Sequence, residues 1–83
     1  MSETEIYSKL KEIFTDIFDD EEIELTSQTT AKDVDGWDSL AHIRLMLTIE
    51  KVFKFKFSSS EIGNLKNVGE LVVLIRERTS GSL

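Results

Sequence analysis

The apolar residues of this 83-residue sequence recur at helical spacing, and this periodicity limits the possible folds more than any other feature. In the first segment they fall at positions i, i+4, i+7, i+8, i+11 and i+12, which is one stripe of an α-helix. This stripe consists of Ile6, Leu10, Ile13, Phe14, Ile17 and Phe18. Ser2 and Glu5 have the spacing of a capping box. We therefore expect a helix from about Ser2 to Phe18.

Two further helical patterns follow. A second helix is predicted from Asp38, a favourable N-cap residue, to about Phe53. Its apolar residues cover most of its circumference, so we expect neighbours on several sides of it. A short helical turn is predicted at residues 62–65, after a second capping box, and a last helix follows. The stripe of that last helix consists of Val68, Leu71, Val72 and Ile75.

The segments between these helices carry different patterns. Residues 26–36 are polar and lack a stripe, which predicts a long ordered loop, and loops of this length are usually functional. Residues 53–57 alternate in the manner of a strand, but the chain offers no partner strand. We therefore expect an extended connector with Phe53 and Phe57 facing inward. The element order predicts an all-α four-helix bundle that forms a single domain, residues 1–83, with frayed ends at 1–2 and 79–83.

Composition excludes several functional classes. The chain has no Cys and one His, so it can form neither a disulfide framework, a zinc-thiolate site nor a multi-His metal site. Its net charge of -6 argues against nucleic acid as a partner. No apolar run approaches the roughly 20 residues that span a bilayer, and no secretory signal pattern is present. We expect a cytoplasmic monomer without a membrane partner.

The start of the second helix is the candidate site. Gly36–Leu40 end the long loop and begin the helix, which places the Ser39 hydroxyl in the first helical turn, facing solvent. Free backbone N–H groups and the positive end of the helix dipole favour an anion at this position. A phosphodiester on Ser39 would lie in that field. The Asp38 carboxylate would oppose it unless a divalent cation bound both groups.

The segment Gly36–Ile43, with the sequence GWDSLAHI, resembles the attachment motif of the acyl carrier protein and phosphopantetheine-binding carrier family. The resemblance covers motif, position and helix order from Ile6 to Ile75. It implies a four-helix bundle of acyl-carrier type in which Ser39 carries a 4′-phosphopantetheine arm whose thiol holds acyl groups as thioesters. It also implies a non-catalytic carrier. Its partners would be a phosphopantetheinyl transferase and the enzymes that load and process the acyl group.

The resemblance assigns roles to neighbouring residues as well. Asp38 and Leu40 would flank the cofactor. Asp38 would help to hold the magnesium ion used by the transferase, and the carrier itself would hold no resident metal. The partner-facing side of the second helix would include Leu40, Ile43, Arg44 and Met46. The core, where the family can shelter an acyl chain, would include Phe14, Leu45, Ile49, Phe53 and Val72.

Charge near the motif departs from that of carriers in bulk fatty acid synthesis, whose second helix is acidic. Here no carboxylate follows Asp38 until Glu50. Residues 1–33 hold ten acidic and three basic side chains, whereas residues 34–60 hold three and four. The motif and this charge pattern look more like carriers of polyketide, nonribosomal peptide or other specialised pathways. A carrier of general fatty acid synthesis is the alternative.

Two further hypotheses concern the same residues. Ser and Asp are also common at ordinary helix starts, so a small helical adaptor that is never modified at Ser39 is an alternative function. A nucleophile pair of Ser39 and His42 would indicate a hydrolase, but the sequence offers no orienting acid and no oxyanion site. We expect His42 on the surface or in a partner contact, and Trp37 as an anchor that holds the loop against the core.

Overall fold

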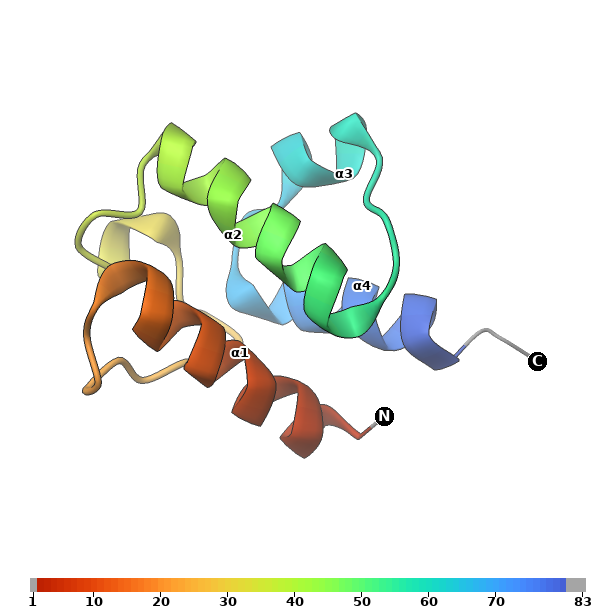
Figure 1. Cartoon of the computed structure of the whole chain (residues 1–83), viewed down its shortest axis with the longest axis horizontal. Coiled ribbons are helices and arrows are strands. Elements are labelled where there is room, and N and C mark those ends of the chain that lie inside the picture. The colour runs from red at the N-terminus through yellow and green to blue at the C-terminus, as the bar shows by residue number, and fades with distance from the viewer. Residues whose placement is uncertain (1, 81–83) are drawn as a thin grey trace.

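The structure, a computed structural model, describes residues 2–80 and shows four helices with no strand in that range (Figure 1). The elements are α1 (Glu3–Phe18), the 3₁₀ turn η1 (Ala31–Asp33), α2 (Ser39–Phe53), α3 (Ser59–Asn64) and α4 (Val68–Ser80). This order confirms the all-α prediction. None of these helices has the length and apolar content needed to cross a membrane.

Helix α1 begins at the predicted capping box. The Ser2 hydroxyl accepts the Glu5 N–H at 3.2 Å, and the Glu5 carboxylate accepts the Ser2 N–H at 3.4 Å. The helix ends at Asp19, which has a left-handed backbone with φ 53°. Ser2, which the sequence predicted as frayed, forms both hydrogen bonds of the box. Met1 lies outside the described residues.

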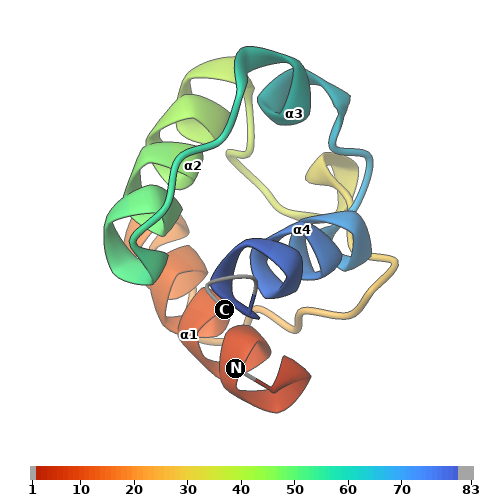
Figure 2. The ribbon, with the colours of Figure 1, turned by 90° about the vertical axis from the view of Figure 1, so that its right-hand side faces the viewer.

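Helices α1, α2 and α4 enclose one apolar core, and the views along and across the molecule agree on this arrangement (Figures 1 and 2). The largest fully buried side chains are Ile6, Leu10, Phe14, Leu45, Met46, Ile49, Val68, Leu71, Val72 and Ile75. The stripe of α4 is buried as predicted, as are the first four members of the α1 stripe. Ile17 and Phe18 are half-buried where α1 ends.

Helix α2 is buried on one side only. Leu45, Met46, Ile49 and Phe53 enter the core, whereas Leu40, Ile43, Leu47 and Val52 remain exposed. The predicted neighbours on several sides of α2 are found in part, because α1 packs against it and His42 contacts α3. In a bundle this small, α2 packs on the core along one face, and its other apolar residues keep 40–70% of their area exposed.

The connector between α2 and α3 follows its prediction. Lys54 ends α2 with φ 63°, and the chain then runs extended with both Phe53 and Phe57 buried. The Phe57 N–H donates to the Glu50 carboxylate at 2.7 Å. The Ser58–Glu61 capping box forms, so α3 begins at Ser59 rather than at the predicted residue 62.

The long loop is ordered because it completes the N-terminus of α4. The Val68 N–H donates to the Thr29 carbonyl and the Gly69 N–H to the Ser27 carbonyl, both at 2.9 Å. These bonds satisfy donors that have no partner inside the helix. At its other end, α4 includes residues 79 and 80, which the sequence predicted as frayed. Thr79 donates its hydroxyl hydrogen to the Ile75 carbonyl at 2.8 Å. The rest of that predicted tail, residues 81–83, lies outside the described range.

Candidate functional site

The candidate site is built around the first turn of α2. Asp38 is the N-cap, as predicted, and its carboxylate accepts the Ala41 N–H at 2.9 Å. The turn before it depends on Gly36, whose φ of 88° favours glycine. Ser39 is the first residue of α2 and is exposed, and its hydroxyl makes no hydrogen bond within residues 2–80. The structure thus presents a free alcohol at a helix N-terminus.

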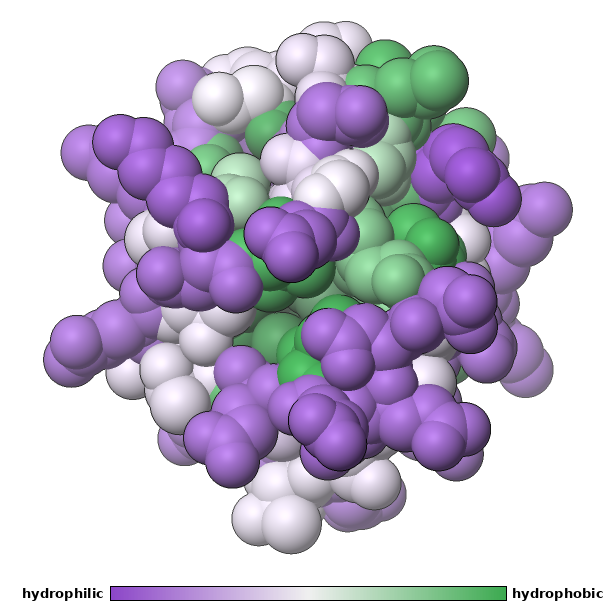
Figure 3. Space-filling view, turned by 90° about the vertical axis from the view of Figure 1, so that its left-hand side faces the viewer, coloured by the Kyte–Doolittle hydropathy of each residue, from purple (hydrophilic) through white to green (hydrophobic). Residues whose placement is uncertain are grey.

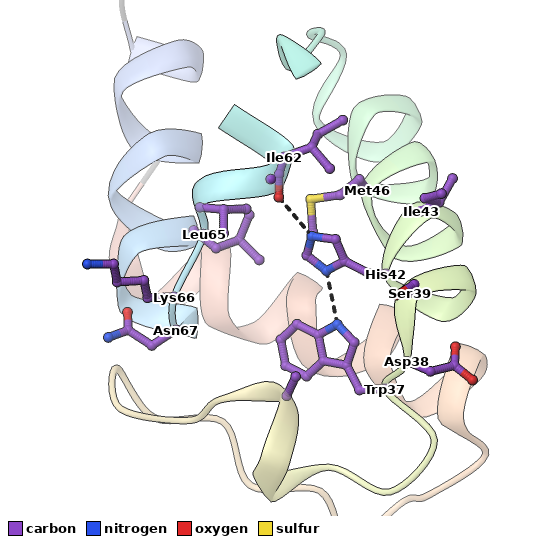
Figure 4. A pocket seen from close by; sticks show the side chains of 13 residues that line it. Trp37, Asp38, Ser39, His42, Ile43, Met46, Ile62, Leu65, Lys66 and Asn67 are labelled. Atoms are coloured by element: carbon purple, nitrogen blue, oxygen red, sulfur yellow. Dashed lines mark hydrogen bonds between the residues drawn. The ribbon is translucent and has the colours of Figure 1, made fainter. Parts of the chain in front are cut away.

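Trp37 holds this turn against the core, as the sequence predicted. Its ring meets Phe14 edge-on with ring centroids 5.2 Å apart, and it lies 6.1 Å from the ring of Phe18. Its indole N–H donates to Nδ1 of His42 at 3.0 Å (Figure 4). Trp37 therefore connects the end of the loop both to α1 and to α2.

The sequence predicted His42 on the surface or in a partner contact, whereas the structure shows it half-buried and hydrogen-bonded on both sides of its ring. Besides the contact with Trp37, its Nε2 lies 3.0 Å from the Ile62 carbonyl oxygen in α3. Both ring nitrogens are therefore engaged, so His42 has no free nitrogen to act as a base toward Ser39. This arrangement gives no support to a hydrolase.

A pocket of about 540 Å³ opens beside Ser39, between α2, α3 and the loop (Figure 4). Its lining includes Trp37, Ser39, His42, Met46, Ile62 and Leu65. Sequence reasoning missed the α3 side of this pocket. A helix of six residues is too short to show a stripe, so only the Ser58–Glu61 box signalled that α3 exists.

The predicted partner-facing residues do not all lie on the surface. Leu40 and Ile43 are exposed, at 70% and 53% of their area, and Arg44 is exposed beside them. Met46 is 1% exposed and lies in the core, so its predicted place on the partner surface was wrong. It lies on the same face as Ile49, one turn along, and reaches the pocket from inside.

The predicted core residues Phe14, Leu45, Ile49, Phe53 and Val72 are all buried, which confirms that prediction.

Figure 3 shows the end of the molecule where α2 begins, with hydrophobic side chains in the middle and upper right of the face, bordered by hydrophilic ones. Within residues 2–80 no three acidic or histidine side chains form a group that could hold a metal ion.

Residues 8–75 match the family model described as "Phosphopantetheine attachment site". The chain belongs to the phosphopantetheine-binding carrier family. It is 33% identical to the acyl carrier protein of Coprothermobacter proteolyticus over 75 residues, which cover 90% of this chain and 92% of that one. It is 32% identical to an acyl carrier protein of Clostridium perfringens over 74 residues, covering 89% and 97%.

The fold agrees with a solved member of the family. The solution structure of the holo acyl carrier protein from Geobacter metallireducens matches this carrier with a TM-score of 0.84 and 41% identity. The match covers 90% of this chain and 86% of that one. The four-helix arrangement is therefore of acyl-carrier type. As a member of this family the protein is a non-catalytic carrier whose prosthetic group is covalently attached 4′-phosphopantetheine.

The first turn of α2 fits such a group. Within the described range the backbone N–H groups of Ser39 and Leu40 donate to no acceptor, so they are free to face a phosphate. The free Ser39 hydroxyl lies at the same end of the helix, where the dipole favours negative charge.

Proposed function

We propose that Ser39 carries the 4′-phosphopantetheine arm and that this carrier presents acyl groups to partner enzymes as thioesters on it. The observation that carries the proposal is the exposed Ser39 hydroxyl on the first residue of α2, which, like the two backbone N–H groups beside it, has no hydrogen bond to residues 2–80. The protein supplies a hydroxyl, a fixed helix end and recognition surfaces, while the arm supplies the thiol chemistry. Tethering raises the effective concentration of the cargo at successive active sites.

The position of Asp38 supports a part in loading the arm. One carboxylate oxygen caps α2, and Asp38 lines the pocket with its carboxylate directed away from the ring of His42 (Figure 4). The other oxygen has no hydrogen bond within residues 2–80. That oxygen is available to a magnesium ion shared with the transferase, and such an ion would offset the like charge of a phosphate on Ser39.

We propose that partner enzymes dock on an exposed stripe of α2, defined here as Leu40, Ile43, Arg44, Leu47 and Lys51. These residues follow one another at helical spacing from the neighbour of Ser39 onward, and all of them are exposed. The stripe contains no carboxylate, and the nearest acidic residue of α2, Glu50, is bonded to the Phe57 N–H. An apolar and basic stripe complements a partner surface that is apolar and bordered by carboxylates.

The same charge pattern supports a carrier of a polyketide, nonribosomal peptide or other specialised pathway. Carriers with an acidic second helix meet basic partner surfaces, and the stripe of this carrier does not suit such surfaces. The curated relatives are named simply acyl carrier proteins, so the pathway assignment depends on the residues around Ser39.

Loading in vitro tests the attachment residue. The apo protein is incubated with coenzyme A, magnesium and a broad-specificity phosphopantetheinyl transferase, and its intact mass is measured. We expect a gain of one phosphopantetheine that Ser39→Ala abolishes. Ser59→Ala is the matched control, because Ser59 is also an exposed serine on the first residue of a helix. Folded wild-type protein that gains no mass would instead indicate an unmodified helical adaptor.

A further inference from the structure

A hydrogen-bonded bridge joins three elements around Ser39, and it consists of Trp37, His42 and Ile62. The indole N–H of Trp37, at the end of the loop, lies 3.0 Å from Nδ1 of His42 in α2. Nε2 of the same ring lies 3.0 Å from the carbonyl oxygen of Ile62 in α3 (Figure 4). One imidazole therefore links the loop, the helix that bears Ser39 and the opposite wall of the pocket.

The groups at the two ends of the bridge determine which ring nitrogen of His42 carries the hydrogen. An indole N–H only donates, and a backbone carbonyl only accepts. Nδ1 must therefore carry the lone pair and Nε2 the hydrogen. The geometry assigns the neutral Nε2–H tautomer to His42, and this single form satisfies both contacts at once.

The α3 end of the bridge lacks another partner. The Ile62 carbonyl would bond to the Lys66 N–H if α3 continued, but that N–H donates to the Glu70 carboxylate at 2.9 Å. Within the described residues His42 is thus the only donor to this carbonyl. Helix α3 also contributes no fully buried residue, so packing holds it less firmly than it holds the longer helices.

We infer that His42 is a positioning residue: through the bridge it fixes α3 and the end of the loop on α2, and so holds two walls of the pocket beside Ser39. The inference rests on the proposed function only where it concerns loading of Ser39. Without the bridge, a partly buried indole N–H and a carbonyl lose their partner, which favours local opening of α3. Fewer molecules then present the Ser39 turn in its binding-competent form.

The tautomer is tested first, in the wild-type protein. Nitrogen-15 NMR of the single imidazole should show an unprotonated Nδ1 and a protonated Nε2 near neutral pH. A protonated Nδ1, or rapid exchange between tautomers, would overturn the inference without any substitution. This measurement does not depend on whether Ser39 is loaded, so it separates failure of the bridge from failure of the proposed function.

Three variants test the positioning role. His42→Phe keeps a ring but removes both bonds, whereas the amide of His42→Gln retains an acceptor and a donor. Ile75→Val is the control for a general loss of stability, because Ile75 is buried in α4 and does not line the pocket. In His42→Phe we expect amide exchange in α3 to rise about ten-fold relative to wild type. His42→Gln should restore most of the protection of α3 from amide exchange. In Ile75→Val, amide exchange should rise no more in α3 than in the other helices.

Loading kinetics provide a readout that a purely structural role would not change. A smaller competent fraction raises the apparent KM of the transferase for the carrier and leaves kcat nearly unchanged. We expect a KM several-fold higher for His42→Phe and close to wild type for His42→Gln. Unchanged α3 exchange in His42→Phe, or a His42→Gln variant that behaves like His42→Phe, would contradict the positioning role.

Discussion

At the scale of single residues, the site depends on which side chain, Asp38 or Ser39, accepts hydrogen bonds from the backbone at the start of α2. Asp38 satisfies one backbone donor of the first turn with one oxygen, and Ser39 satisfies none. A capping residue therefore leaves the following hydroxyl and the first two N–H groups free. Asp38 stabilises the helix and, in our proposal, also assists in loading, and substitution can separate the two roles.

Asp38→Asn should separate them. Asparagine caps helices about as well as aspartate, so helix content and the free energy of unfolding should change by less than about 0.5 kcal/mol. Loading of Ser39 should slow by at least ten-fold if the lost charge serves to bind magnesium. Circular dichroism, urea unfolding and timed intact-mass measurements check the two effects. Equal loading rates for wild type and variant would remove the proposed role of Asp38.

The positions of some site residues could be predicted from the sequence and those of others could not, for physical reasons. Asp38 and Ser39 could be placed because capping follows from neighbours in the chain. Met46 was misplaced because a stripe that covers most of a helix does not show which part of it faces the core. His42 was misjudged because its partner Ile62 is 20 residues away, on a helix whose position depends on tertiary packing.

At the scale of the elements, the long loop and α4 are held together at Gly69. A Cβ built on this residue would lie 2.7 Å from the Ser27 carbonyl oxygen, the acceptor of the Gly69 N–H. The sequence predicted an ordered loop but gave no sign of this contact, because a glycine in a helical pattern does not reveal what approaches it. The requirement for glycine is therefore set by packing between two elements.

Gly69→Ala should destabilise the protein by about 1–3 kcal/mol, since the loop must move away from α4 to admit the methyl group. Gly63→Ala is the matched control. Gly63 lies in α3 with no atom within 4 Å of its built Cβ, so alanine there should be neutral or stabilising by up to about 1 kcal/mol. Urea unfolding measures both. Similar effects for the two variants would show that the approach of Ser27 is not what Gly69 accommodates.

Glu61 connects α3 to the end of α4. The hydrogen bond from the Ser58 N–H, followed by the charge of Arg78, holds the pKa of Glu61 below its usual 4.5. A carboxyl group whose pKa is depressed by folding stabilises the native state above that usual value. This contribution disappears as the pH falls through the folded pKa, because the folded protein must then take up a proton that it disfavours.

Glu61→Gln keeps an acceptor for the capping box but removes the charge. The variant should be less stable than wild type at pH 7, and the difference should shrink as the pH is lowered well below 4.5, where the wild-type carboxyl is also neutral. Urea unfolding at both pH values measures the two differences. A difference that stays constant with pH would mean that Glu61 acts through its shape and not through its charge.

At the scale of the whole molecule, charge is divided between two parts of the chain. The excess of acidic side chains lies in residues 1–33, which form α1 and most of the long loop, whereas residues 34–60, including α2, hold four basic and three acidic ones. The net charge of -6 therefore comes from the first part of the chain and not from the segment with the helix that bears Ser39. In the proposed docking mode, partners that approach Ser39 meet the apolar and basic stripe of α2.

Reversing charge on each part separately tests which surface partners recognise. Arg44→Glu with Lys51→Glu reverses the stripe, and Lys11→Glu with Lys32→Glu makes the same charge change on exposed positions of the acidic part. We expect the first pair to lower kcat/KM with the enzyme that loads the native cargo by about ten-fold or more, chiefly through slower association, and the effect to weaken as salt is raised. The second pair should change kcat/KM by less than about two-fold, since the altered residues lie outside the stripe, and both proteins should keep wild-type helix content. Equal losses of kcat/KM in the two variants would show that the enzyme responds only to the overall charge of the carrier. An increase of kcat/KM for the first pair would indicate that the partner surface carries basic residues instead of carboxylates.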